Sequence, residues 1–183
     1  MSELLILVDR HDRKKGCASK LEAHRTGQLH RAFSVFIFDD AGRLLLQQRA
    51  FGKYHSQGLW TNTCCGHPRP GERTKAAAER RLREEMGITC SLRKVSTLLY
   101  REPVSNQLIE HEFDHIFVGV NPGDPIANPN EAHAWQWTTP AQIHARINAA
   151  PGTFTVWFRR IFESIGLAGV HAWKELAPAN RQA

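Results

Sequence analysis

The sequence has 183 residues, of which 42% are hydrophobic and 23% charged, and its formal net charge is +6. This length and composition are typical of a globular protein with one buried core, so we expect a single domain over residues 1–183. The positive charge favours an anionic ligand, but the basic residues are scattered, which argues against a nucleic-acid partner. No segment approaches the ~18 apolar residues that a membrane-spanning helix needs. Four cysteines without a secretory signal predict free thiols and a cytoplasmic location.

Strand patterns dominate the first third of the chain. The apolar run LLILV near the start predicts a first strand. Two further strands are expected at Ala32–Phe38 and Arg43–Arg49. They flank Asp39-Asp40-Ala41-Gly42, a turn signal that predicts a β-hairpin.

The middle of the chain contains a clear helix pattern. The run TKAAAERRLREEM, Thr74–Met86, consists mainly of strong helix formers. We expect Thr74 to cap its N-terminus and Gly87 to end it. This helix is therefore predicted with both of its boundaries.

The remaining elements alternate between strands and helices. Strands are expected at Val95–Tyr100, Leu108–Val120 and Trp135–Trp137, and helices at Gln142–Asn148 and Thr155–Ile165. A surface loop rich in Pro, Gly and Asn is predicted over Asn121–Asn130, and a frayed tail over roughly residues 175–183. Strand pairs mixed with helices predict an α/β or α+β sandwich with a mixed sheet.

Charged residues lie on the inward face of the predicted helix. Helical spacing places Ala78, Arg81, Leu82 and Glu85 on one face, so two charges share a stripe with apolar residues. Burying such charges is costly without a ligand or a partner. Arg81 and Glu85 are therefore candidates for binding, although an ion pair on a solvated edge explains them equally well.

The strand at Leu108–Val120 begins with alternating carboxylates. A period of two places Glu110, Glu112 and Asp114 on one face, which later becomes apolar and is therefore expected to be buried. Glu110 and Glu112 should be roughly 6–7 Å apart at Cα, and their repulsion favours a cation between them. The alternative is that both face water. We expect Asp114 to be structural.

Three histidines can complete a metal site with these carboxylates. His24 and His30 lie in HRTGQLH, and His67 follows two adjacent cysteines. Each one alone is more commonly a structural residue than a ligand. Together with two carboxylates they form a set of three nitrogen and two oxygen donors that suits Mn²⁺ or Zn²⁺. The sequence does not show whether they converge.

The adjacent cysteines Cys64 and Cys65 do not fit the common metal or redox motifs. Structural zinc sites use spaced pairs of cysteines, and no second pair follows here. A Cys-x-x-Cys redox motif is also absent from the sequence. One cysteine is therefore expected to do chemistry and the other to pack as a small apolar residue.

The segment that starts at Gly66, GHPRPGERTKAAAERRLREEMGI, resembles the Nudix box, G-x₅-E-x₇-R-E-U-x-E-E-x-G-U, in which U is a bulky aliphatic residue. The matching positions are Gly66, Glu72, Arg80, Leu82, Glu84, Glu85, Gly87 and Ile88. Arg81 departs from the pattern, because hydrolases of the Nudix superfamily have glutamate there. The resemblance implies a Nudix-like α/β/α sandwich, and the missing carboxylate argues against ordinary Nudix hydrolysis.

Beyond this box, the chain resembles the type 1 isopentenyl-diphosphate isomerases of the same superfamily from about Leu4 to Ile165. The resemblance rests on HRTGQLHRAFSVFIF, QQRAFGKYHSQGLWTNTCCGHP, the altered box and YREPVSNQLIEHE. It implies an isomerase of isoprenoid biosynthesis that converts isopentenyl diphosphate to dimethylallyl diphosphate by a 1,3-allylic proton shift. The sequence has no long terminal extensions, and in this it resembles the bacterial members of the family.

The resemblance also implies roles for individual residues. One Mn²⁺ or Zn²⁺ would be held by His24, His30, His67, Glu110 and Glu112. Cys65 matches the catalytic cysteine, and Cys64 its non-catalytic neighbour. Glu112 matches a carboxylate that is both metal ligand and acid/base, Tyr100 a tyrosine that assists proton transfer, and Trp157 an aromatic residue over the reacting carbons.

The diphosphate end of the substrate is expected to need positive charge. The resemblance implies Mg²⁺ bound to the substrate phosphates, Glu85 and the backbone carbonyl of Cys65. The expected diphosphate-binding cations are Lys20, Arg49, Lys53 and Arg81. Neither a flavin nor a nucleic-acid or membrane partner is expected, and the chain should act as a monomer or weak homodimer.

Two other functions fit parts of the sequence. A Nudix hydrolase of a nucleoside diphosphate derivative is the main alternative, but it leaves Cys65, the two alternating glutamates and Arg81 without roles. A metal-stabilised basic binding module, for example for RNA, would use the histidines structurally. The isomerase accounts for more of these residues than either alternative does.

Overall fold

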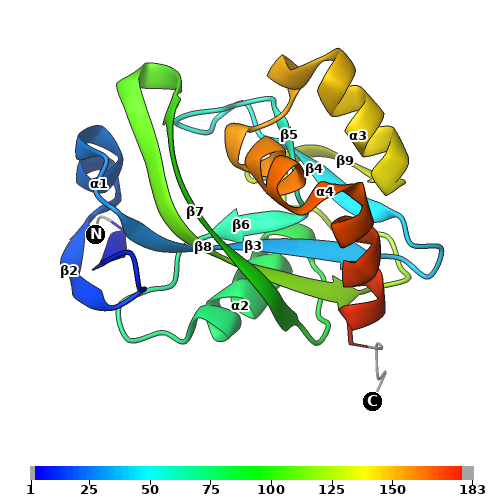
Figure 1. Cartoon of the computed structure of the whole chain (residues 1–183), viewed down its shortest axis with the longest axis horizontal. Helices are drawn as coiled ribbons and strands as arrows, with labels where there is room; N and C mark the ends of the chain where they lie inside the picture. The colour runs from blue at the N-terminus through cyan, green and yellow to red at the C-terminus, as the bar shows by residue number, and fades with distance from the viewer. Residues whose placement is uncertain (1–2, 179–183) are drawn as a thin grey trace.

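The computed structural model describes residues 3–178, which form one nine-stranded sheet and four α-helices. The strands are β1 (Leu4–Val8), β2 (Lys14–Ser19), β3 (His30–Phe38), β4 (Leu44–Arg49), β5 (Trp60–Thr61), β6 (Cys64–Gly66), β7 (Arg93–Val104), β8 (Leu108–Val120) and β9 (Ala132–Thr138). The helices are α1 (Lys20–Thr26), α2 (Thr74–Met86), α3 (Pro140–Ala149) and α4 (Val156–Leu176), with single 3₁₀ turns at Ser105–Gln107 and Pro151–Thr153. Figure 1 shows the sheet crossing the molecule between α2 and α4.

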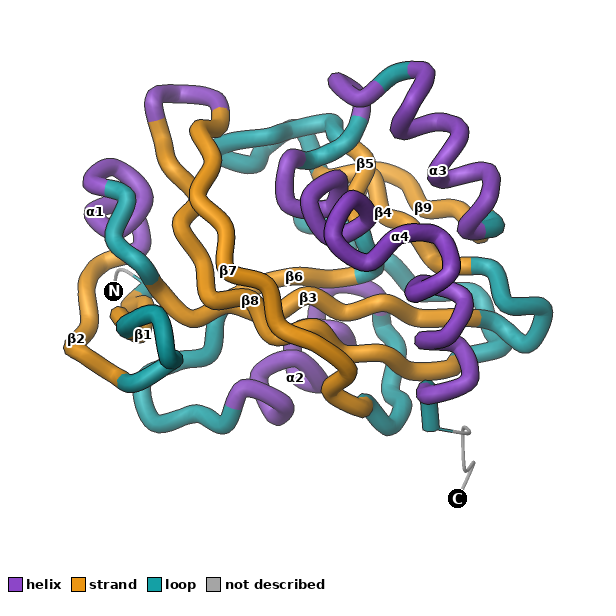
Figure 2. The backbone as a smooth tube through the Cα atoms, in the orientation of Figure 1, coloured by secondary structure: helices purple, strands orange, loops and turns teal. Residues whose placement is uncertain are grey.

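Strand β3 is the centre of the sheet. It pairs in parallel with β8, from His30 opposite Glu112 to Phe38 opposite Val120. It pairs antiparallel with β1, β4 and β6, while β7 pairs antiparallel with β8 and β9 with β4. The predicted mixed sheet is therefore confirmed. The two long neighbours β7 and β8 extend beyond the sheet as a curved hairpin (Figure 2).

Each face of the sheet packs against helices and forms its own core. On one face α3 and α4 cover a cluster that includes Phe36, Phe158 and Trp173. On the other face α2 packs Ala78 and Leu82 against inward side chains of β3. These two cores on opposite faces confirm the predicted α/β/α sandwich.

Several predicted elements match the structure closely. The helix Thr74–Met86 and the strand Leu108–Val120 have the bounds that the sequence predicted. Gly87 ends the helix in the left-handed conformation (φ 66°), as expected. The prediction that Thr74 caps α2 was wrong: Arg73 occupies the N-cap position, and no side chain accepts a hydrogen bond there.

The segment between β1 and β3 was not predicted. Strand β2 has the sequence KKGCAS, which contains no apolar alternation, and forms because the edge of β1 offers it hydrogen-bonding groups. Helix α1 has only seven residues, too few for a clear helical period. Ser19 caps it by accepting a hydrogen bond from the backbone of Glu22.

The C-terminal part differs from expectation in one helix. The helix predicted over Thr155–Ile165 continues, after a kink at Gly166 (φ 69°, ψ 167°), to Leu176. Val170 and Trp173 of this second segment are buried, so packing holds it in place. The frayed tail was expected from residue 175; residues 175 and 176 are helical instead, and residues 179–183 lie outside the described part. None of the described helices is both long and apolar enough to cross a membrane.

Candidate active site

A cavity of about 790 Å³ opens beside β6, β8 and the start of α4. The predicted site residues that line it are Lys20, Arg49, Lys53, Cys65, His67, Arg81, Glu85, Tyr100, Glu110, Glu112 and Trp157. His24 and His30 are fully buried and contact the two glutamates of this wall. The structure therefore brings together all the site residues that the sequence had proposed.

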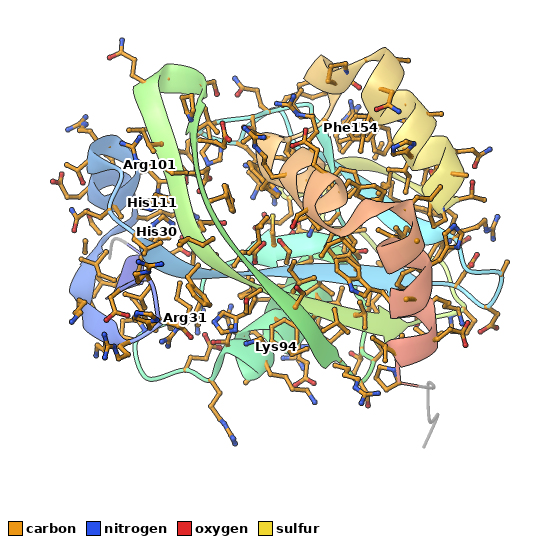
Figure 3. All side chains as sticks on the ribbon, in the orientation of Figure 1. His30, Arg31, Lys94, Arg101, His111 and Phe154 are labelled. Atoms are coloured by element: carbon orange, nitrogen blue, oxygen red, sulfur yellow. The ribbon has the colours of Figure 1, made fainter. Side chains whose placement is uncertain are left out.

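Helix α1 carries the first histidine of the site to the end of the sheet. Gly27 ends the helix with φ 66°, and a Cβ at this position would lie 3.1 Å from Arg101 and 3.2 Å from Ile109. Glycine therefore allows α1 to pack closely against the β7–β8 hairpin. His111 Nδ1 donates a hydrogen bond to the Gly27 carbonyl at 2.9 Å. Figure 3 labels His30, Arg101 and His111 at this end of the molecule.

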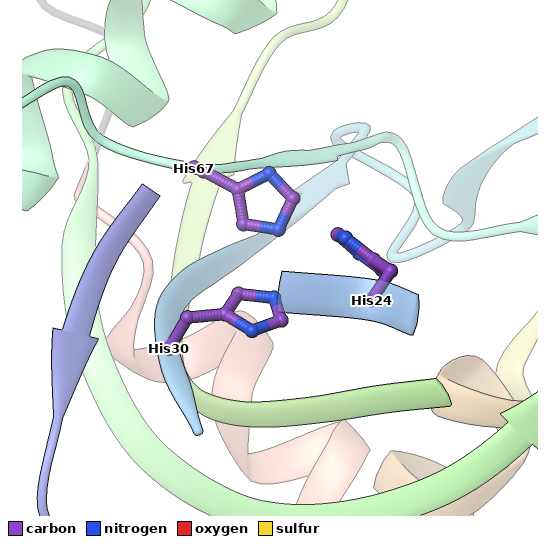
Figure 4. Close-up of side chains that lie close together, drawn as sticks. All are labelled: His24, His30 and His67. Carbon is purple, nitrogen blue, oxygen red and sulfur yellow. The ribbon is translucent and has the colours of Figure 1, made fainter. Parts of the chain in front are cut away.

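The three predicted histidine ligands form one cluster. His24 comes from α1, His30 from the start of β3, and His67 directly follows β6. Their ring centroids are 4.9 Å apart for His24 and His30, 5.1 Å for His30 and His67, and 5.7 Å for His24 and His67. Figure 4 shows the three rings around one common space.

The two alternating glutamates of β8 face this cluster. Glu110 Oε2 lies 3.2 Å from His24 Nε2, and its Oε1 lies 3.0 Å from Nε2 of His55. Glu112 Oε1 lies 3.0 Å from His67 Nε2. Both carboxylates are buried, so the alternative in which they face water is excluded. The strand period that the sequence showed is responsible, because it turns both side chains inward.

The donor atoms of this cluster fit a divalent cation. His24 Nδ1 donates to the Lys20 carbonyl (2.7 Å), and His30 Nδ1 donates to the Gln28 carbonyl (2.8 Å). Because a carbonyl only accepts, both rings carry a proton on Nδ1 and can offer Nε2 to a metal. Within residues 3–178, the buried His30 Nε2 and Glu110 Oε2 have no hydrogen-bond partner. Among the described residues, three sets of donors each lie within 4.8 Å of one another: His24, His30 and His67; His24, His55 and Glu110; and His30, Glu110 and Glu112.

The charges in the cluster stabilise one another. Burial alone would raise the pKa of Glu110, but its close contacts with the imidazoles of His24 and His55 hold it well below its usual range. Burial alone would lower the pKa of His67, yet the carboxylates of Glu112 and Glu3 together outweigh this effect and raise the pKa to about 9. In the metal-free protein His67 is therefore an imidazolium at neutral pH. The site concentrates negative charge that a cation can neutralise.

Asp114 lies on the same face of β8 but does not line the cavity. Ser34 Oγ donates a hydrogen bond to its Oδ2 at 2.8 Å. Burial and the neighbouring charge of Glu112 raise the pKa of Asp114 well above its usual range. Its position behind the wall of the cavity agrees with the structural role expected for it.

The two adjacent cysteines point to opposite faces of the sheet. Strand β6 pairs with β3, with Cys65 opposite Ser34 and Cys64 opposite Val35. Cys64 is fully buried in the core beneath α2. Cys65 packs toward the other core and lines the cavity, and burial raises the pKa of its thiol to about 12. Strand alternation thus separates a packing cysteine from one that reaches the site.

Two aromatic residues, Tyr100 and Trp157, also line the cavity. Tyr100 is the cross-strand partner of Glu112, and its hydroxyl donates a hydrogen bond to Glu112 Oε2. Burial and this carboxylate raise the pKa of Tyr100 well above its usual range, so it remains a neutral phenol. Trp157 is buried in the first turn of α4 and lines the cavity. The Arg49 guanidinium lies 5.2 Å from its ring centroid.

The four predicted diphosphate-binding cations line the cavity, each with contacts of its own. Lys20 Nζ contacts Glu3 at 2.9 Å. Arg49 donates to the backbone carbonyls of residues 55 and 56, and so braces the loop that follows β4. Lys53 forms an ion pair with Glu131. Arg81 contacts three carboxylates, at 2.5 Å for Glu85, 3.1 Å for Glu84 and 3.2 Å for Glu131.

The Nudix-like segment forms a loop and a helix, as the resemblance implies. Glu72 accepts hydrogen bonds from Arg80 and from the backbone of Arg69, which fixes the loop against α2. Glu85 is buried at the other end of the helix and accepts from Gln47 Nε2 at 3.0 Å. The inward charges of α2 therefore line the cavity and do not form an isolated solvated pair.

Among the cavity residues that the sequence analysis did not propose, two contact proposed site residues directly and are important for the site: His55 and Glu131. His55 Nε2 contacts Glu110, and its ring meets Trp157 edge-on at a centroid distance of 6.0 Å. Glu131 contacts two of the predicted cations. His55 stands in a loop without a periodic pattern, and Glu131 follows the predicted surface loop, so neither had a local signal beyond its residue type.

The chain is similar to known proteins over most of its length. The sequence matches the NUDIX domain family over residues 28–158. It is 55% identical over 177 residues to the isopentenyl-diphosphate Delta-isomerase of Serratia proteamaculans, covering 97% of this chain and 99% of that protein. It is 50% identical over 176 residues to isopentenyl-diphosphate Delta-isomerase 2 of Photorhabdus laumondii, covering 96% and 99%. A Deinococcus radiodurans crystal structure matches the fold with a TM-score of 0.69 and 25% identity over 81% of this chain and 90% of that one.

The fold and the box around α2 define a Nudix-domain protein. Full-length identity then separates it from the hydrolases of that superfamily. The chain belongs to the isopentenyl-diphosphate Delta-isomerase family and is an enzyme of the isomerase class.

Proposed function

We propose that the enzyme converts isopentenyl diphosphate to dimethylallyl diphosphate with Cys65 and Glu112 as its two acid/base groups. The observation that carries the proposal is that Cys65 and the hydrogen-bonded pair of Tyr100 and Glu112 line the same cavity. The reaction adds a proton to C4, removes one from C2, and moves the double bond from the 3,4 to the 2,3 position. Two proton-transfer groups beside one allyl unit are what this shift needs.

The protonation states of these groups suit such an exchange. The thiol of Cys65 keeps its proton at neutral pH because burial raises its pKa to about 12. The carboxylate of Glu112 is ionised: burial opposes this, but His30 and His67 lower its pKa. One group donates a proton to the substrate and the other accepts one, so the total number of protons on the pair is unchanged. A proton must then return from Glu112 to Cys65 before the next turnover. Tyr100 holds the proton that its hydroxyl shares with Glu112.

Trp157 protects and stabilises the reacting carbons. Protonation of an unactivated alkene generates positive charge at the tertiary carbon, and an aromatic face stabilises such a cation by about 2 kcal/mol when water is excluded. Water would also trap the cation as an alcohol. The buried position of Trp157 at the cavity wall supports both roles.

The histidine and glutamate donors described above fit a divalent cation, and a second cation would accompany the substrate diphosphate. We propose that His24, His30, His67, Glu110 and Glu112 would hold one Mn²⁺ or Zn²⁺, and that Glu85 and the Cys65 carbonyl would hold Mg²⁺ together with the substrate diphosphate. Such ions supply positive charge that orients carboxylates and neutralises a diphosphate. No flavin is required, because the shift involves no redox step.

The positive side chains of the cavity would hold the diphosphate. Lys20, Arg49, Lys53 and Arg81 are the proposed ligands. Arg81 stands where Nudix hydrolases have a glutamate, and its guanidinium can bind phosphate oxygens in pairs. Replacing a metal-binding carboxylate by a phosphate ligand would favour retention of the diphosphate over its hydrolysis.

We further propose that the chain acts in the cytoplasm as one domain, and as a monomer or weak homodimer. The free state of all four cysteines is compatible with a reducing compartment. Its partner would be the small diphosphate substrate alone, with no nucleic acid or membrane. The cavity, with its mixed acidic and basic walls, supports a small polar ligand.

Incubation with isopentenyl diphosphate in D₂O plus Mg²⁺ and Mn²⁺ tests the proposal. We expect deuterium in the allylic product and no release of phosphate. Omitting the protein, and replacing it with the Cys65→Ala variant, are the controls. Release of phosphate without a labelled allylic product would instead support a Nudix hydrolase.

A further inference from the structure

Two of the proposed diphosphate-binding cations share one carboxylate. Glu131 contacts the Lys53 ammonium through Oε2 and Arg81 Nη2 through Oε1, the latter at 3.2 Å. Lys53 belongs to the loop after β4, whereas Arg81 belongs to α2. Glu131 therefore joins cations from two separate elements, and all three side chains line the cavity.

The backbone fixes the position of Glu131 on both sides. Its carbonyl accepts a hydrogen bond from Ala50 at the end of β4 (3.0 Å), and its amide donates to Asn128 at 2.9 Å. The Asn128 amide in turn donates to the Glu85 carbonyl of α2 at 2.8 Å. The loop that precedes β9 is thus attached to the same two elements that carry Lys53 and Arg81. These hydrogen bonds fix the backbone of Glu131 relative to both elements.

The ionic partners of the two cations differ. Arg81 also contacts Glu84 and Glu85, so α2 itself restrains it. Lys53 has no ionic partner other than Glu131 among the described residues. Without this carboxylate the Lys53 side chain would regain the rotamer freedom of a long flexible stem.

Glu131 is charged in this position. Burial opposes its ionisation, but the hydrogen bond from Lys53 and the charge of Arg81 lower its pKa below the usual range. A carboxylate between two cations orients both and leaves their outer donors available for phosphate oxygens.

We infer that Glu131 is a positioning residue that holds Lys53 and Arg81 in place for the substrate diphosphate. The inference rests on the proposed roles of Lys53 and Arg81 as diphosphate ligands. It predicts that Glu131 acts on binding of the diphosphate and not on proton transfer, because it touches neither Cys65 nor the pair of Tyr100 and Glu112.

The Glu131→Gln variant tests the inference, because it keeps the shape and removes the charge. We expect KM for isopentenyl diphosphate to rise about tenfold and kcat to stay within about threefold. This combination is expected when a variant loses an interaction that stabilises the bound substrate and the transition state equally. Calorimetric titration with inorganic diphosphate and Mg²⁺ should show about tenfold weaker binding, the loss expected of one charge-assisted contact. Thermal unfolding of the variant checks that it is folded.

Glu84→Gln is the matched control. Glu84 contacts Arg81 at 3.1 Å, but it does not contact Lys53 and is more exposed than Glu131. We expect its KM and diphosphate affinity to stay within about twofold of the parent protein. Equal effects of the two variants would overturn the inference, since loss of any charge near Arg81 would then explain the result.

A second pair of variants separates this inference from the proposed function. If Lys53→Met weakens diphosphate binding and Glu131→Gln does not, Glu131 is no positioning residue. Tighter binding by Glu131→Gln would also overturn the inference, because the carboxylate would then be a competitor of the phosphate. In the Lys53→Met background we expect Glu131→Gln to have less than half its effect on binding, because one of its two targets is gone. If Lys53→Met leaves binding unchanged, the diphosphate role of Lys53 fails, and the inference fails with it.

Discussion

The Tyr100 hydroxyl donates a hydrogen bond of 2.5 Å to Glu112 Oε2, while Oε1 of the same carboxylate lies 3.0 Å from His67. The two oxygens of Glu112 therefore face different partners. Register in the β7–β8 pair creates this arrangement, because Tyr100 and Glu112 are directly opposite one another. One carboxylate can thus serve the metal cluster and the proton chemistry together.

Tyr100→Phe should separate these two functions. We expect kcat to fall by about 10²-fold, the lower end of what a positioned proton-transfer group contributes, while KM changes little. The phenyl ring keeps the packing, so the unfolding temperature serves as a control for the fold. Steady-state kinetics with isopentenyl diphosphate measures the effect. A kcat equal to that of the parent protein would show that the hydroxyl takes no part in proton transfer.

The two cysteines allow a matched comparison of chemistry and packing. Cys65→Ala should lower kcat by at least about 10³-fold, since it removes one of the two proton-transfer groups. Cys64→Ala should retain most of the turnover but lower the free energy of unfolding by about 1 kcal/mol, because it leaves a small cavity under α2.

Kinetics and chemical denaturation of both variants measure these outcomes side by side. Comparable losses of turnover in the two variants would contradict the assignment of Cys65 as the only catalytic cysteine. Unchanged stability of Cys64→Ala would contradict its packing role.

Much of the sandwich could be predicted from sequence periodicity alone. The hydrophobic patterns of Ala32–Phe38 and Leu108–Val120 predicted the two central strands, although not their parallel pairing, and the helix formers of Thr74–Met86 predicted α2. These elements are long and follow one period, and so local signals suffice. Strand β2 and helix α1 are short, and their existence depends on the edge of β1 and on the β7–β8 hairpin.

The site residues also differ in whether a local sequence pattern could predict them. Strand alternation predicted that Glu110 and Glu112 share a buried face, and the structure confirms this burial. Resemblance supplied the convergence of distant histidines, which no local pattern contains. Neither the strand pattern nor the resemblance identified His55 and Glu131 as site residues, because their contacts depend on how two loops fold back over the sheet.

Arg81→Glu restores the carboxylate that the Nudix box expects. We expect binding of inorganic diphosphate with Mg²⁺ to weaken by at least about tenfold, because a phosphate ligand is replaced by a like charge. Arg81→Lys is the control that keeps the charge and removes the planar fork, and it should lose less. Calorimetric titration measures both variants. Unchanged affinity in Arg81→Glu would exclude a role of this residue in diphosphate binding.

Metal binding should release a proton from His67. Burial alone would lower the pKa of this imidazole, but the carboxylates of Glu112 and Glu3 together raise the pKa to about 9. Because the folded-state pKa lies above the ordinary value, the imidazolium dominates at pH 7, and a metal ligand must be neutral. Affinity for Mn²⁺ or Zn²⁺ should therefore rise up to about tenfold per pH unit between pH 7 and 8, and level off above about pH 9.

Calorimetry of the chelator-treated protein at pH 7, in buffers of different ionisation enthalpy, counts the protons released. The His67→Gln variant, which has no imidazole to deprotonate, should release about one proton fewer than the parent protein and bind metal more weakly. The same proton count in both proteins would contradict the raised pKa of His67. Metal affinity independent of pH from 7 to 8 would contradict its role as a ligand that must first lose a proton.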